Sequence, residues 1–156
     1  MNRSLKGILG KYKSENALEM LKEYAKSEDI SFVKPAPIEL IDAFERDTAK
    51  FPMELREIYE FTNGFFSPMF DLLPIFDRNN IKKTWDSINR ANSEQNNFDF
   101  SQEWLDKFCI FGRFDGRFAA AFDKQEHKLW IEFPDGNMHG QSGTLRDFLL
   151  IGLESY

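Results

Sequence analysis

The sequence predicts an α+β fold, in which an antiparallel sheet over about 108–141 and a strand near 69–76 are surrounded by packed helices. In the N-terminal part, apolar residues recur at spacings of three and four, the pattern of a helix with one buried face. Farther along, two apolar runs are separated only by Asp115-Gly116, a strong signal for a short β-hairpin loop. The chain has 156 residues with no internal repeat and no linker, so we expect one domain.

Three helices are predicted before residue 65. The first covers 15–26 with Ser14 as its N-cap. The second begins after Pro37 and the third at Pro52, since proline is preorganised for the first turn of a helix. Asn63-Gly64 ends the third helix, because both residues reach the left-handed C-cap conformation at low cost. The faces expected to be buried are formed by Ala17, Leu18, Leu21, Tyr24 and Ala25, then Ile38, Ile41, Phe44 and Thr48, then Leu55, Ile58, Tyr59 and Thr62.

The middle of the chain changes from helical to extended patterning and back. Residues 69–73 form an apolar strand pattern that Pro74 interrupts or places at a sheet edge. A fourth helix follows, with Ile81, Trp85 and Ile88 on its apolar face. The stretch 91–99 is polar, rich in asparagine and without periodicity, which predicts an exposed loop. Ser101 is then expected to cap a short helix through Trp104 and Leu105.

The C-terminal third predicts three strands and a last helix. Runs 108–114 and 117–123 form the hairpin, and 128–133 adds the third strand. Alternation places Trp130 on the face opposite the main core, where it is either covered by a helix or exposed as an interface anchor. Ser142 or Thr144 caps the last helix. Burial on the helix-facing side of the sheet is expected for Phe118, Phe122, Leu129 and Ile131, and the last helix packs through Leu145, Phe148, Leu149 and Leu153.

Composition excludes several classes of protein. Twenty Lys and Arg against 26 Asp and Glu leave a formal charge of −6, which opposes direct nucleic-acid binding and favours a basic partner, although it also simply promotes solubility. The single cysteine cannot form an internal disulfide, which predicts a reducing compartment. No apolar stretch is long enough for a signal-peptide core or a membrane span, so we expect a cytoplasmic protein that does not contact the membrane.

No motif indicates catalysis. His127 and His139 are not spaced as a helical metal pair, and Cys109 lies in an apolar strand, so we expect no metal site and a structural thiol. The segment 140–144 approaches a nucleophile-elbow pattern, but Thr144 replaces the last glycine, and an N-cap explains the serine better. Glycines are scattered singly, without a phosphate-binding loop. The sequence therefore predicts no catalytic residue and no cofactor.

One segment carries a local charge signal. Between Asp86 and Asp106 there are five acidic residues and one basic residue, a net 1 − 5 = −4. These carboxylates are either a solvated surface or a means of steering a basic protein partner, with a tryptophan as hydrophobic anchor. The partner-binding residues nominated on this basis are Glu94, Asp99, Glu103, Trp104, Asp106 and Trp130.

The order of these motifs resembles the SUKH superfamily. The N-terminal signature is similar over 37–45, which contains the pair Phe44-Glu45, over the helix at 51–61, and at Asn63-Gly64. The C-terminal similarity comprises Ile110-Phe111-Gly112, Phe122-Asp123, Leu129-Trp130 and the helix from Ser142 to Leu149. The resemblance covers about 35–150, within a single SUKH-like domain over 1–156 in which 1–34 is an N-terminal helical extension.

Three features depart from the superfamily pattern. Phe51 stands where leucine is usual, Phe65-Phe66 replaces a glycine cluster, and 91–100 resembles an insertion. The resemblance implies an α+β fold and a non-enzymatic role. Many bacterial members are immunity proteins that neutralise a cognate toxin, often a nuclease, whereas fungal relatives regulate cell-wall synthesis through protein interactions.

The function predicted from the sequence is that of an immunity protein for a polymorphic or contact-dependent toxin, which would be the basic partner. Two alternatives are a regulatory interaction module of the same fold and a hydrolase with an unrecognised carboxylate site. The first would lack a toxin gene beside it, and the second would need a deep pocket with acids of perturbed pKa. Nothing in the sequence indicates an oligomeric state.

Overall fold

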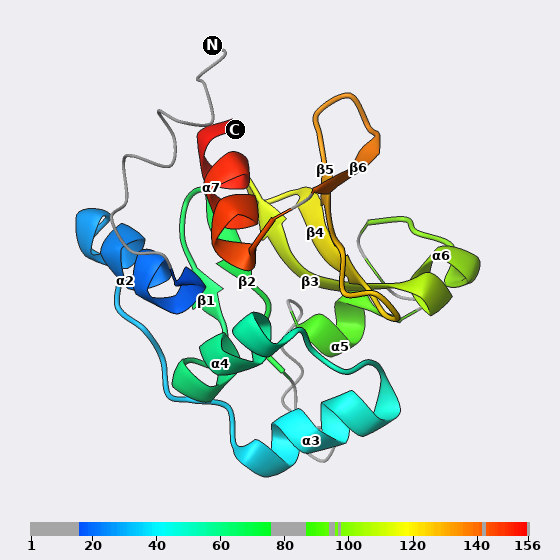
Figure 1. The fold of residues 1–156 in the computed structure, drawn as a ribbon, viewed down its shortest axis with the longest axis horizontal. Helices are drawn as coiled ribbons and strands as arrows, with labels where there is room; N and C mark the ends of the chain where they lie inside the picture. The colour runs from blue at the N-terminus through cyan, green and yellow to red at the C-terminus, as the bar shows by residue number, and fades with distance from the viewer. Residues whose placement is uncertain (1–15, 76–86, 94–95, 97, 142, 156) are drawn as a thin grey trace.

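The computed structural model describes residues 16–75, 87–93, 96, 98–141 and 143–155 (Figure 1). The described part contains helices α2 (Ala17–Ser27), α3 (Ile38–Asp47), α4 (Met53–Phe61), α5 (Ile88–Ala91), α6 (Gln102–Lys107) and α7 (Leu145–Ser155). Its strands are β1 (Phe65–Phe66), β2 (Phe70–Leu72), β3 (Phe108–Phe114), β4 (Phe118–Asp123), β5 (Leu129–Glu132) and β6 (Met138–Gln141). All six strands form one antiparallel sheet in the order of the chain, which confirms the predicted α+β class.

The helices begin close to the predicted starts, with one different cap. Asn16, and not Ser14, caps α2, since its side-chain oxygen accepts hydrogen bonds from the backbone N–H of Leu18 (2.8 Å) and Glu19 (3.2 Å). Ser14 lies outside the described residues. Pro37 and Pro52 directly precede α3 and α4 as predicted. Three residues on the predicted faces differ from the expectation: Ile38 is exposed at the start of α3, and Leu18 and Thr48 are only partly buried.

The segment between α4 and β2 contains a strand that the sequence pattern did not predict. Gly64 adopts a φ of +95° after the end of α4, and β1 follows immediately. Two residues are too short to show alternation, so β1 is defined only by its pairing with β2. The predicted fourth helix is described only as α5, which Ser87 caps, and residues 81–86 lie outside the described part of the chain.

The β3–β4 hairpin forms where Asp115-Gly116 predicts it. Both residues have positive φ, 52° and 70°, as a primed turn requires. Arg117 belongs to the turn, where its N–H donates to the carbonyl of Phe114 (3.1 Å), so β4 begins one residue later than predicted. Phe111 is an extra residue in β3, because the register shifts between Ile110 and Gly112. This bulge redirects the side chains of β3, which alternation alone does not predict.

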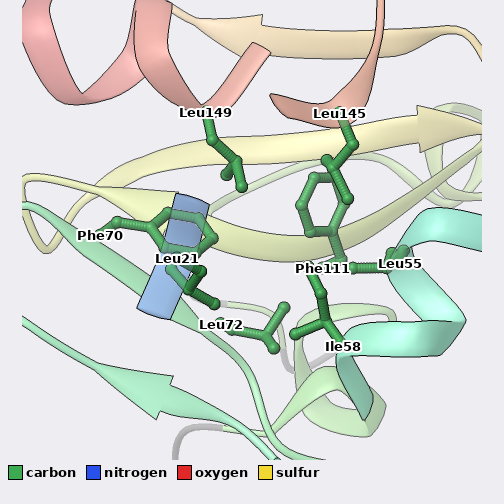
Figure 2. Close-up of a pocket in the computed structure, with 8 residues that line it drawn as sticks. All are labelled: Leu21, Leu55, Ile58, Phe70, Leu72, Phe111, Leu145 and Leu149. Carbon is green, nitrogen blue, oxygen red and sulfur yellow. The ribbon is translucent and has the colours of Figure 1, made fainter. Parts of the chain in front are cut away.

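One face of the sheet is covered by α2, α4 and α7 (Figure 1). Figure 2 shows side chains from these helices and from β2 and β3 converging on a small gap, which is too small to hold a water molecule. The residues around it are Leu21, Leu55, Ile58, Phe70, Leu72, Phe111, Leu145 and Leu149. This apolar contact is the centre of the core and offers no space for a ligand.

Burial along β4 and β5 agrees with the prediction at three of four positions. Phe122 and Ile131 are fully buried and Leu129 is buried. Phe118 is only partly buried, because it lies at the hairpin end of β4, where the Arg117 guanidinium lies over its ring at 4.7 Å. The prediction that Phe118 is a core residue was therefore wrong.

The second face of the sheet is contacted by α5 and α6 at β3. Asn92 lies in the stretch predicted to be an exposed loop, but its side-chain amide pairs with the backbone of β3, as a neighbouring strand would. Its oxygen accepts from the N–H of Ile110 and its nitrogen donates to the carbonyl of Ile110, both at 2.8 Å. The start of the loop is thus fixed to β3 by paired hydrogen bonds that sequence periodicity cannot indicate. Among the helices of the described ranges, none is long and apolar enough to cross a membrane.

Candidate functional site

Five aromatic rings form a continuous row on the second face of the sheet, which we call the aromatic ladder. The ring centroids are separated by 6.0 Å for Phe98–Phe100, 4.0 Å for Phe100–Trp104, 4.7 Å for Trp104–Phe108 and 5.4 Å for Phe108–Trp130. The first three contacts are stacked and the last is edge-to-face. All five side chains are partly exposed. The ladder runs from the loop before α6, through α6 and the start of β3, to β5.

Local hydrogen bonds place the rings of the loop and of α6. Ser101 caps α6 as predicted, accepting from the N–H of Trp104 (3.2 Å). The side-chain oxygen of Asn96 accepts from the N–H of Phe98 and of Phe100, both at 3.1 Å, and thereby shapes the loop. The next residue in α6, Leu105, is buried, so the turn that carries Trp104 is anchored to the core.

Two of the nominated carboxylates, Asp99 and Glu103, directly adjoin ladder residues in the chain, whereas Asp106 projects from the side of α6 that faces away from Trp104. Asp99, Glu103 and Asp106 are exposed on the loop and on α6, and Asp106 accepts a hydrogen bond from the side chain of Gln102 (2.9 Å). Glu94 lies outside the described residues. Lys124 is brought to the end of α6, where its N–H donates to the carbonyl of Lys107 (2.9 Å). The tertiary structure therefore gives this surface an acidic side and a basic end. The charge count over residues 86–106 did not include the basic end, because Lys124 lies outside that segment.

The sequence left open whether Trp130 is covered by a helix or exposed as an interface anchor, and the structure shows features of both. Through Phe108 it joins the ring of Trp104 on α6, yet it remains partly exposed. The ammonium of Lys128 lies 5.3 Å from the centre of the Trp130 ring, within cation–π range. Both nominated tryptophans thus belong to one surface.

The stacking restricts what this surface can bind. Phe100 and Trp104 each have neighbouring rings on both faces, so only their edges are available. A planar ligand that stacks on an aromatic face has no place within the row. Apolar ring edges bordered by carboxylates instead suit a protein surface, where aromatic anchors are surrounded by a charged rim.

Sequence analysis missed three members of the ladder. Phe98, Phe100 and Phe108 were not nominated as binding residues. A signal was present, since Phe100, Trp104 and Phe108 recur at intervals of four residues. In a helix this spacing would bring the side chains to one face, but α6 covers only Gln102–Lys107, so Phe100 and Phe108 reach the row from the flanking loop and strand.

The hydroxyl and imidazole groups considered as candidates for chemistry make capping, packing or ion-pair contacts in the fold. Thr144 caps α7, accepting from the N–H of Asp147 (3.2 Å), and Ser142 lies outside the described residues. His127 packs edge-on against Phe122, and His139 Nε2 lies 3.8 Å from a carboxylate oxygen of Asp135. Within the described ranges, no three His, Cys, Asp or Glu side chains gather so as to hold a metal ion.

Cys109 is fully buried, and burial raises the pKa of its thiol from 9.0 to about 12, against a smaller opposite effect of Lys124. We expect the folded protein to resist thiol reagents at mildly alkaline pH, because the reactive thiolate is scarce and covered. Folding favours the neutral thiol, so this contribution to stability is complete below about pH 9 and is lost as the pH rises toward 12. The measurement is the rate of labelling with and without denaturant, and rapid labelling without denaturant would contradict the burial.

Residues 35–150 match the family model described as SMI1 / KNR4 family (SUKH-1). No curated protein and no solved structure matches the chain. The matched range runs from the segment before α3 into α7 and includes the whole ladder, whereas α2 precedes it.

Proposed function

Because the chain belongs to the SMI1 / KNR4 family (SUKH-1), we propose that it is a non-enzymatic protein-binding domain, an immunity protein that neutralises a cognate bacterial toxin. The family is generally non-catalytic, and its members commonly bind other proteins. The proposal assigns binding to the surface formed by the aromatic ladder and by Asp99, Glu103 and Asp106.

The proposal depends on one observation: partly exposed aromatic rings and carboxylates lie next to one another on one surface. The partly exposed side chains of Trp104 and Trp130 supply apolar anchors of the type that dominates protein–protein affinity. The neighbouring carboxylates favour approach of a basic protein. A nuclease toxin must itself be basic to hold nucleic acid, so its nucleic-acid groove would be attracted to this surface. Occupation of that groove would exclude the substrate.

We further propose that α2 belongs to the same domain, although the family match begins after it. Met20 and Leu21 are fully buried, and Leu21 lines the same apolar contact as Leu55 and Leu149. Tyr24 donates to the hydroxyl of Ser67 in the β1–β2 turn (3.1 Å). A domain trimmed to the matched range would lose these contacts and expose the core.

The test first examines the neighbouring reading frame for a toxin-like domain, and then measures the binding kinetics of that domain at low and high salt. The triple variant Asp99→Asn, Glu103→Gln, Asp106→Asn should associate more slowly and with a flatter salt dependence, because rim charges act mainly on the association rate. Trp104→Ala and Trp130→Ala should speed dissociation and cost about 2 kcal/mol or more of binding free energy.

A matched control neutralises three exposed carboxylates elsewhere: Glu28→Gln, Glu39→Gln and Glu57→Gln. These residues lie on or next to α2, α3 and α4, away from α6 in Figure 1. The control removes the same formal charge, so a specific role predicts a larger effect from the α6 triple variant. An equal effect of both variants would mean that only net charge matters, and no binding would contradict the proposed function.

A further inference from the structure

Strand β6 forms one edge of the six-stranded sheet, and no described strand lies beyond it. The opposite edge strand, β1, is only two residues long, and shortness is one way in which proteins limit pairing at an edge. Residues Met138–Gln141 of β6 include neither proline nor lysine, the residues that commonly protect an edge. The longer edge is therefore the less protected one.

The outward backbone groups of β6 can be identified from the ladder of hydrogen bonds. The N–H of Phe133 donates to the carbonyl of Asn137 (3.0 Å) at the β5–β6 turn. Hydrogen-bonded positions alternate along an antiparallel pair, so His139 bonds to β5, whereas Met138 and Gly140 occupy the alternate positions. Their N–H and C=O groups point away from β5, where an added strand can bond with them.

Gly140 provides a position for a side chain from such a strand. A Cβ at Gly140 would lie 2.6 Å from Cε and 2.9 Å from Nζ of Lys128, and 3.2 Å from Cζ2 of Trp130. Because glycine has no Cβ, Gly140 leaves room for the ammonium of Lys128 to lie over the indole of Trp130. Side chains opposite one another in neighbouring strands share a face, so a residue opposite Gly140 would project across it toward Trp130.

We propose that β6 binds an extended segment of the protein partner as a seventh strand, with a lysine or arginine opposite Gly140 that replaces Lys128 over Trp130. The inference rests on the proposed function and specifies how the partner engages the end of the aromatic ladder. Backbone hydrogen bonds would supply affinity, and the cation–π contact would supply selectivity for a basic residue. The charge of −6 and the carboxylates beside the ladder favour a cationic segment over a second copy of this acidic chain.

The experiment uses isotope-labelled protein and a blocked peptide of alternating threonine and valine with one central arginine. At millimolar peptide we expect slower hydrogen exchange at the amides of Met138 and Gly140, together with a shift of the Trp130 indole resonance. Replacing the arginine by norleucine should weaken binding about fivefold, the size of an exposed cation–π contact. A peptide methylated on the amides that face β6 should lose binding. Absence of amide protection with the arginine peptide would overturn the proposal.

The matched protein variants are Met138→Pro and Met138→Val. Proline removes an outward N–H but no bond to β5, and proline is tolerated on edge strands, whereas valine keeps the N–H. Met138 is partly buried against the core, so both variants lose part of this packing, and we expect similar melting temperatures for the two. Peptide binding should be lost only for Met138→Pro. Equal peptide binding by both variants would contradict strand addition at this edge. A dimer seen in sedimentation that Met138→Pro abolishes and Met138→Val keeps would show that a second copy of this chain, and not a basic partner segment, occupies the edge. A toxin complex unaffected by Met138→Pro would leave the proposed function standing while showing that this inference is wrong.

Discussion

Replacing Phe122 with alanine is expected to lower the free energy of unfolding by about 3 to 5 kcal/mol. The ring is fully buried on the helix-covered face of the sheet, with ring centroids of Phe51 and Phe111 at 6.1 Å and of His127 at 5.8 Å. Alanine would remove apolar area from the core and leave a cavity, which the neighbouring rings cannot fill because they come from three separate segments of the chain. Equilibrium urea unfolding of the full chain measures the change.

Phe118→Ala is the matched control within the same strand. Phe118 is on the same predicted face as Phe122 but is only partly buried, beside the hairpin turn. We expect a loss of about 1 kcal/mol or less, since most of the cavity term is absent at a partly exposed site. Equal losses for the two variants would contradict the burial difference along β4.

Gly152→Ala is expected to destabilise the protein by about 1 to 3 kcal/mol. Helix propensity alone predicts the opposite sign, because alanine is favoured over glycine by about 1 kcal/mol in a helix interior. Gly152 lies in α7 where the helix contacts β3, and a Cβ there would overlap the ring of Phe114. Both residues are buried, so the ring cannot move away without disturbing the core.

A double-mutant cycle with Phe114→Leu tests this explanation. In the Phe114→Leu background, the aromatic ring that meets the new methyl group is absent, so Gly152→Ala should become neutral or slightly stabilising. The measured quantity is the coupling free energy between the two sites from urea unfolding. Stabilisation by Gly152→Ala in the unmodified protein would show that α7 is not held against β3 at this glycine.

Local features of the sequence were sufficient for most of the elements. The period of apolar residues predicted the helices that became α2, α3, α4 and α7, and Asp115-Gly116 predicted the β3–β4 hairpin. These signals act within a few residues, because backbone preferences and caps depend on near neighbours. The family resemblance over about 35–150 was also present in the order of motifs, and the family match confirms it.

The candidate site could be predicted only in part. The sequence nominated Trp104 and Trp130, which one row of rings joins, together with Asp99 and Glu103 next to that row, because aromatic and charged residues stand out in composition. It did not predict that Phe98 and Phe100 join them, since the shape of their loop depends on hydrogen bonds to the side chain of Asn96. Composition identifies candidate residues, whereas a continuous row of rings requires three-dimensional positions.

The sequence by itself determined the α+β class, the main helices, the β3–β4 hairpin and the acidic character of the chain. Only the tertiary structure decided that Phe111 forms a bulge, that Gly152 lies against Phe114, and that Gly140 lies beneath Trp130 and Lys128. Each of these features depends on strand register or helix docking, which joins residues from different elements. Local patterns determine which residues face inward. Which residue of another element each of them contacts is determined only by strand register and helix docking, because these involve the whole chain.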